Sequence, residues 1–188
     1  MKNPFLAGML IGLGCCMYVA IPDKTIGAIC FSLGLLAIRL FQLDLYTGKT
    51  QFFLKKNSPY KPMKIFWIFI DNCLGVNFIF LLVMFFSPNI LVGAQKIGMI
   101  KDAIPIDTLI FNSIMCGALM TIATYRLTPL WISTLAVAAF ILAGFNHSIA
   151  DYFYFVALGH GPISLLKILI IAAGNLIGGR LAAAFEGD

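Results

Sequence analysis

The chain has 188 residues, of which 61% are hydrophobic and only 11% are charged. Soluble domains carry about 25% charged residues, so this composition excludes a soluble globular domain and indicates a membrane protein. The net charge of +5 requires no nucleic-acid partner, because an excess of lysine and arginine on one side of a membrane protein is a topology signal.

The apolar segments predict an all-α membrane protein that forms a single transmembrane domain over residues 1–188. A membrane-spanning helix needs roughly 20 mostly apolar residues. Residues 1–20 lack a convincing signal-peptide cleavage site, so we expect them to belong to a first span. In chain order the six predicted spans are residues 5–21, 25–43, 65–86, 107–124, 130–146 with a continuation to 158, and 163–185.

The basic residues predict the orientation of these spans. Lys2, Arg126 and Arg180 lie on one side, together with five lysines in the connection between the second and third spans. The opposite side has only Lys24, Lys96 and Lys101. The positive-inside rule therefore predicts that both termini are cytoplasmic, with the chain crossing the inner (cytoplasmic) membrane. The five lysines of the connection are Lys49, Lys55, Lys56, Lys61 and Lys64.

The fifth predicted span contains a polar run in the middle of apolar sequence. Residues 145–151 read FNHSIAD, which places an asparagine, a histidine, a serine and a carboxylate between two apolar segments. Polar groups inside a membrane are costly unless they line a cavity, so His147 is a candidate for a functional site. Non-helical backbone at this depth has the same significance.

The two halves of the chain resemble each other. Asn72 and Gly75 in the third span recur as Asn175 and Gly178 in the sixth, at an offset of 103 (175 − 72 = 103). The halves, about residues 1–93 and 94–188, are predicted to be inverted repeats, because each has an odd number of spans. Inverted repeats with interrupted helices are typical of transporters and channels.

The same offset relates Gly14 to Gly117 and Asp44 to His147. Asp44 lies in a stretch where Asp, Thr and Gly break the apolar run at the end of the second span. An ordinary helix end is one explanation of this stretch. The matched position in the repeat favours the other, that spans two and five are both interrupted.

Four motifs resemble the formate/nitrite transporter family. They are residues 25–35 (TIGAICFSLGL), 44–48 (DLYTG), 144–150 (GFNHSIA) and 174–179 (GNLIGG). The resemblance covers all six spans. It implies an aquaporin-like protomer, a homopentamer with one pore in each protomer, and small monovalent weak-acid anions such as formate, nitrite or hydrosulfide as substrates. It implies no cofactor and no enzymatic activity.

The resemblance also implies roles for particular residues. The central pore histidine corresponds to His147, the loop threonine that hydrogen-bonds it to Thr47, and the vestibule lysine to Lys101. A proton would accompany the anion, because a weak acid crosses an apolar slit at lower cost when neutral. The apolar constrictions correspond to Phe31, Leu35, Leu45, Tyr46, Phe140 and Met120. Tyr46 would add a hydroxyl to the slit.

The sequence departs from the family at several positions. Gly117 stands where the family has an asparagine beside the pore, residues 42–43 are Gln-Leu instead of Gly-Ala, and the cytoplasmic N-terminal helix is absent. Four charges lie within predicted spans, where an unpaired charge costs several kcal/mol. We therefore expect two ion pairs among them, Arg39 with Asp71 and Asp151 with Lys167. Such pairs can also serve packing alone.

Two other functions remain open at this point. Gly117 leaves room for a pore that conducts small neutral solutes. The second open function is that of a membrane enzyme, because His147 and Asp151 stand four residues apart on a helix and could hold a metal. The five cysteines show no C-x-x-C spacing, so they predict neither a metal site nor a disulfide framework. His160 lies in a predicted loop, outside the site.

Overall fold

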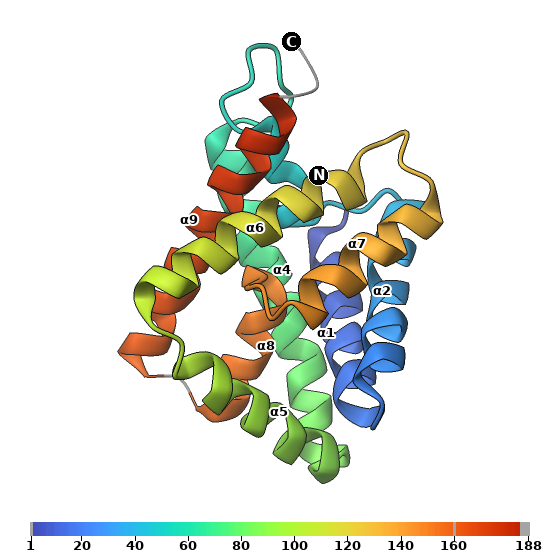
Figure 1. Cartoon of the computed structure of the whole chain (residues 1–188), viewed down its shortest axis with the longest axis vertical. Helices are drawn as coiled ribbons and strands as arrows, with labels where there is room; N and C mark the ends of the chain where they lie inside the picture. The colour runs from blue at the N-terminus through green and yellow to red at the C-terminus, as the bar shows by residue number, and fades with distance from the viewer. Residues whose placement is uncertain (1, 160, 185–188) are drawn as a thin grey trace.

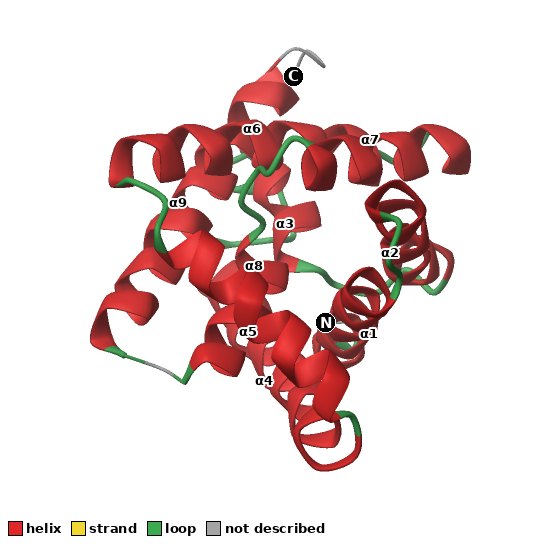
Figure 2. Cartoon of the chain, turned by 60° about the horizontal axis from the view of Figure 1, so that its bottom comes forward, coloured by secondary structure: helices red, strands yellow, loops and turns green. Residues whose placement is uncertain are grey.

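The computed structural model describes residues 2–159 and 161–184, and every regular element in that part of the chain is helical (Figures 1 and 2). His160 and Phe185, on which predictions were made, lie outside the described residues. The elements are α1 (Pro4–Ala20), α2 (Lys24–Leu40), α3 (Tyr46–Lys49), a 3-10 turn η1 (Thr50–Phe52), α4 (Pro62–Phe86), α5 (Pro88–Asp102), α6 (Ile106–Thr124), α7 (Leu130–Leu142), α8 (Ser148–Leu158) and α9 (Pro162–Ala184).

Among the described helices, α4, α6 and α9 are long and apolar enough to cross a membrane. The helices α1, α7 and α8 are apolar but shorter. Many large apolar side chains point outward, for example Trp67, Phe86 and Trp131, which are 51%, 78% and 65% exposed. A surface of this kind suits lipid or other subunits rather than water.

Helix α1 lies in backbone contact with α4, and α6 lies in backbone contact with α9. A Cβ atom on Gly8 would lie 2.0 Å from the Asn72 carbonyl oxygen, and one on Gly117 would lie 2.2 Å from the Asn175 carbonyl oxygen. Only glycine permits such close approach of two helices. The counterpart of Gly117 in the first half is therefore Gly8. The predicted match of Gly14 with Gly117 is wrong, because Gly14 faces Phe31 of α2 instead.

The helical path is interrupted at residues 41–45, between α2 and α3, and at residues 143–147, between α7 and α8. Both breaks turn through a residue in the left-handed region, Gln42 with φ 55° and Gly144 with φ 75°. Glycine adopts this conformation readily, whereas glutamine adopts it at a cost. Each break frees backbone groups that need partners inside the protein.

Asn72 supplies those partners for the first break. This side chain is fully buried in α4. Its Oδ1 accepts from the Tyr46 N–H at 2.7 Å, and its Nδ2 donates to the carbonyl oxygens of Pro4 and Asp44 at 2.7 and 3.1 Å. One asparagine thus joins α1, α4 and the start of α3.

Asn175 does the same for the second break, from α9. Its Oδ1 accepts from the Ser148 N–H at 2.8 Å, and its Nδ2 donates to the carbonyl oxygens of Ser113 and Asn146, both at 2.8 Å. In this matched pattern Asn146 takes the place of Asp44, at an offset of 102 (146 − 44 = 102). The predicted match of Asp44 with His147 is therefore wrong by one residue.

Helix α5 was not predicted, because residues 88–102 were assigned to the connection between the third and fourth spans. It packs mainly against α8 and also contacts α1 (Figure 2). The glycine at position 98 permits this close packing, because a Cβ atom on Gly98 would lie 2.6 Å from the Tyr154 carbonyl oxygen. The helix carries Lys101 and Asp102 in its last turn, and so positions one charge of the candidate site, Lys101.

Candidate functional site

His147 and Thr47 meet where the two breaks come together. His147 is the N-cap of α8 and is 1% exposed, and Thr47 in α3 is fully buried. His147 Nε2 lies 2.9 Å from Thr47 Oγ1, and the Ala150 N–H donates to His147 Nδ1 at 3.1 Å. Because Nδ1 accepts a hydrogen bond, the hydrogen of the neutral ring sits on Nε2 and is donated to the threonine hydroxyl.

One phenylalanine ring stacks on this histidine, and a second packs against the first. The Phe140 ring stacks on the His147 ring with centroids 5.5 Å apart and an angle of 17° between the planes. Phe31 meets Phe140 edge to face, at 6.3 Å. These two residues, which come from α2 and α7, were predicted to form a constriction, and the structure places them beside the histidine.

A cavity of about 260 Å³ lies on this side of His147. Phe31, Phe140 and His147 line it, together with Lys101 and Asp151. Most of the remaining lining is apolar or aromatic, including Tyr18, Ile97, Ile100, Ile104, Ile141, Phe145 and Tyr154. We call this space the histidine cavity.

The charges in the histidine cavity form an ion pair that the sequence did not predict. Lys101 Nζ lies 2.8 Å from Asp151 Oδ1, and the Asn146 side chain donates to Asp151 Oδ2 at 2.6 Å. The predicted pair of Asp151 with Lys167 is wrong. Lys167 instead binds Asp102, the last residue of α5, at 3.1 Å.

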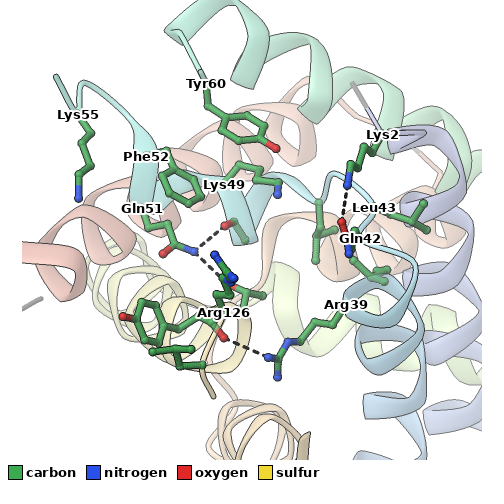
Figure 3. Close-up of a pocket in the computed structure, with 16 residues that line it drawn as sticks. Lys2, Arg39, Gln42, Leu43, Lys49, Gln51, Phe52, Lys55, Tyr60 and Arg126 are labelled. Carbon is green, nitrogen blue, oxygen red and sulfur yellow. Dashed lines mark hydrogen bonds between the residues drawn. The ribbon is translucent and has the colours of Figure 1, made fainter. Parts of the chain in front are cut away.

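A larger cavity, of about 890 Å³, opens on the other side of α3, and Figure 3 shows its lining. Leu45 and Gly48, which flank Thr47 in sequence, belong to its wall. We call it the basic cavity, because its lining includes Lys2, Arg39, Lys49, Lys55 and Arg126. The histidine cavity is thus lined by His147, and the basic cavity is lined by the neighbours of Thr47 in sequence.

The other predicted constriction residues lie between or beside the cavities. Leu35, Tyr46 and Met120 are 1%, 5% and 1% exposed, and none is among the residues that line either cavity. The Tyr46 hydroxyl donates to the Ala172 carbonyl at 2.9 Å, and its ring packs on Phe69. The hydroxyl therefore joins α3 to α9, and the expectation that it enters the slit is wrong.

Arg39 does not pair with Asp71. Its guanidinium donates to the carbonyl oxygens of Tyr125 and Thr128, at 3.1 and 2.8 Å, and to the Ser133 hydroxyl. Tyr125 caps the C-terminal end of α6, where free carbonyls attract a cation. Asp71 takes part in no ion pair with the residues that the structure describes.

Gly117 faces α9, where its missing side chain would strike the Asn175 backbone, and it lines neither cavity. No asparagine could point from this position into a pore without a shift of the helices.

Within residues 2–159 and 161–184, no group of three His, Cys, Asp or Glu side chains could hold a metal ion.

Two parts of the site went unnoticed in the sequence. One is the contact of Asn146 with Asp151, and the other is the Asp44 network described below with the basic cavity. The offset of 102 would have marked both positions, though not their partners, since it matches Asp44 with Asn146. Each of these residues adjoins a break and uses its side chain to bind a group on another element.

Comparison with known proteins decides the family. Residues 2–185 match the family model described as formate/nitrite transporter. The chain belongs to the formate/nitrite transporter family. The members of this family are membrane transport proteins, and the match gives no support to the membrane-enzyme alternative. None of the curated proteins matches the chain.

Two solved structures share the fold of this family member. A pentameric formate channel with formate bound superposes with a TM-score of 0.82 at 18% identity, over 98% of this chain and 93% of the channel. An ion channel of the same family superposes with a TM-score of 0.74 at 21% identity, over 96% of this chain and 84% of the other.

Proposed function

We propose that this member of the formate/nitrite transporter family conducts small monovalent weak-acid anions, such as formate, nitrite or hydrosulfide, with a proton. The observation that carries the proposal is the buried pair of His147 and Thr47, with one cavity lined by His147 and another lined by the neighbours of Thr47. A buried polar pair of this kind inside a membrane protein is a candidate transport site.

The proposed assembly is a homopentamer, each protomer with its own pore. In this proposal each protomer has six spans in two inverted repeats. The interrupted second span consists of α2 and α3, and the interrupted fifth span consists of α7 and α8. The matched bonds of Asn72 and Asn175 support this repeat. The pentameric formate channel that shares the fold supports the ring of five. Both termini are proposed to face the cytoplasm.

In the proposed mechanism the substrate enters the histidine cavity and meets Lys101 first. Phe31 and Phe140 exclude water beside His147, so a bare anion would be costly there. An anion that takes up a proton crosses this apolar section as the neutral acid. Thr47 and the Ala150 N–H fix the orientation and tautomer of the imidazole.

A pore for small neutral solutes is the second candidate, and one observation favours it. The Lys101 charge is already matched by Asp151 at 2.8 Å, so the histidine cavity attracts anions less than a free lysine would. On this alternative, His147 and Thr47 would offer hydrogen bonds to an uncharged solute.

Solute flux into liposomes that contain the purified chain separates the two candidates. We expect formate, nitrite or hydrosulfide uptake well above that of empty liposomes, and faster uptake when the external solution is made more acidic. Glycerol and urea serve as neutral probes of comparable size. If only the neutral probes enter, the anion proposal is wrong and the neutral-solute pore replaces it.

A further inference from the structure

The basic cavity is larger and more highly charged than transport of a small anion requires. Its five cationic side chains come from five separate segments, the N-terminus, α2, α3, the connection from η1 to α4, and the connection from α6 to α7. Figure 3 shows these segments surrounding the same space, with Arg39 and Arg126 on one side and Lys49 and Tyr60 on another. At about 890 Å³ the cavity is within the range of pockets that bind cofactor-sized molecules.

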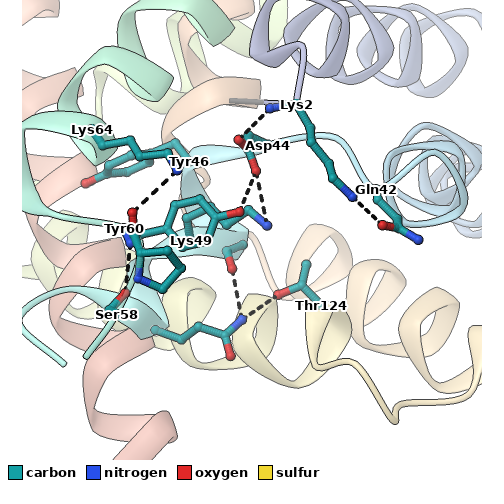
Figure 4. A network of polar contacts seen from close by, with 12 residues as sticks. Lys2, Gln42, Asp44, Tyr46, Lys49, Ser58, Tyr60, Lys64 and Thr124 are labelled. Atoms are coloured by element: carbon teal, nitrogen blue, oxygen red, sulfur yellow. Dashed lines mark hydrogen bonds and ion pairs between the residues drawn. The ribbon is translucent and has the colours of Figure 1, made fainter. Parts of the chain in front are cut away.

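The described residues offer this cavity little negative charge. No aspartate or glutamate is among its lining residues. The nearest carboxylate in this network, Asp44, is 1% exposed and already bound, as Figure 4 shows. It accepts from the Lys2 backbone N–H at 2.9 Å and from the Tyr60 hydroxyl at 2.8 Å, and it pairs with Lys49 at 3.3 Å.

The remaining cations keep their charge for a ligand. Arg39 is held by two carbonyl groups and a hydroxyl, which leave its positive charge uncompensated. Lys55 and Arg126 take part in no ion pair within the described part of the chain. The Lys2 ammonium binds the neutral Gln42 side chain. Four of the five cations therefore lie around one cavity without a carboxylate partner among the described residues, and a monovalent anion would neutralise only one of them.

Buried polar contacts hold the wall of this cavity in place. Gln51, which is 5% exposed, donates from its side chain to the Gly48 carbonyl at 2.9 Å and to the Thr124 hydroxyl at 3.3 Å. The wall at Gly48 and Leu45 adjoins Thr47, the partner of His147. A molecule bound here would cover the entrance to the proposed pore.

We propose that the basic cavity binds a small phosphate-bearing polyanion, such as diphosphate or the phosphate chain of a nucleotide, and that the bound ligand closes the pore. Several guanidinium and ammonium groups converging on one space suit phosphate oxygens, which accept charge-assisted hydrogen bonds from both. The closure, though not the binding, rests on the proposed transport function. The same headgroup chemistry occurs in anionic phospholipids, which the experiment distinguishes.

The first test measures binding of diphosphate to the full chain in nanodiscs of zwitterionic lipid, by isothermal titration calorimetry. We expect saturable binding of one diphosphate per chain. The combined substitution Lys55→Gln and Arg126→Gln should weaken it at least about tenfold, because both residues contribute charged hydrogen bonds. Neither side chain takes part in a hydrogen bond or ion pair with the described residues, so the fold should tolerate their loss.

The matched control is Lys96→Gln, which removes an exposed lysine of α5 that lines neither cavity. It should leave diphosphate binding unchanged. Equal weakening by Lys96→Gln and by the double variant would show that only net charge matters, and would overturn the site. Absence of saturable binding to the wild-type chain would overturn it as well. If binding vanishes only when anionic phospholipid is added, the lipid headgroup is the natural source of the phosphate.

The second test measures formate flux with diphosphate on one face of the liposome at a time. We expect a block only from the face that carries residues 53–61, and none in the Lys55→Gln and Arg126→Gln variant. Binding without any block would overturn the closure while leaving the site. Absence of formate flux in every sample would contradict the transport proposal instead, and the calorimetry would still decide the binding.

Discussion

Replacing Asn175 with leucine should destabilise the folded chain by about 3 kcal/mol or more. The substitution leaves three buried backbone groups without partners, the N–H of Ser148 and the carbonyl oxygens of Ser113 and Asn146. Each unsatisfied buried group costs about 1–3 kcal/mol. Leucine has a branched shape like asparagine but is larger, so no cavity is left, and the lost hydrogen bonds together with tighter packing account for the effect.

Thermal unfolding in detergent, followed by size-exclusion chromatography, measures this loss. Asn77→Leu is the matched control, since Asn77 is a half-buried asparagine of α4 whose side chain donates to the Tyr152 hydroxyl at 2.9 Å and to no backbone group of either break. Asn175→Leu should lower the unfolding temperature far more than Asn77→Leu. Equal effects of the two substitutions would show that Asn175 does not hold the second break.

Replacing Lys101 with methionine should destabilise the protein and reduce anion flux together. Asp151 is 2% exposed and would remain as a buried carboxylate beside His147 without its cation. Removing one partner of a buried ion pair costs about 3–5 kcal/mol. The remaining negative charge would also repel an anion from the histidine cavity, so we expect formate flux to fall at least about tenfold.

A second substitution should reverse the loss of stability. In the double variant Lys101→Met and Asp151→Asn the carboxylate is gone, and the new amide oxygen still accepts from Asn146. Lys167→Met is the control, because its partner Asp102 is 43% exposed and can be hydrated, so about 1 kcal/mol or less should be lost. A double variant as unstable as Lys101→Met, or a control as costly as Lys101→Met, would contradict the buried pair.

Much of the architecture was predictable because it depends on local sequence. The apolar segments marked the membrane helices, and the polar run at residues 145–151 marked the second break. The repeat offset of 103 matched Asn72 with Asn175 but failed at the breaks. The reason is a one-residue difference in spacing, since Tyr46 precedes Asn72 by 26 residues and Ser148 precedes Asn175 by 27 (72 − 46 = 26, 175 − 148 = 27).

The partners of the charged residues could not be predicted, because they depend on a helix that the sequence concealed. Residues 88–102 mix apolar positions with glycines, Gln95 and Lys96, and so were assigned to a connection. As helix α5 they bring Lys101 to Asp151 and Asp102 to Lys167. Arg39 binds carbonyl groups, which no pattern of side chains in a sequence reveals.

The pH dependence of formate uptake in wild-type and His147→Ala liposomes tests the central claim most directly. Size-exclusion chromatography first establishes that the variant is folded, because His147 also caps α8. We expect wild-type uptake to rise as the external pH falls, since the substrate crosses with a proton, and we expect this dependence to be lost in His147→Ala. A folded variant that takes up formate with the wild-type pH profile would contradict the role of His147 in the pore.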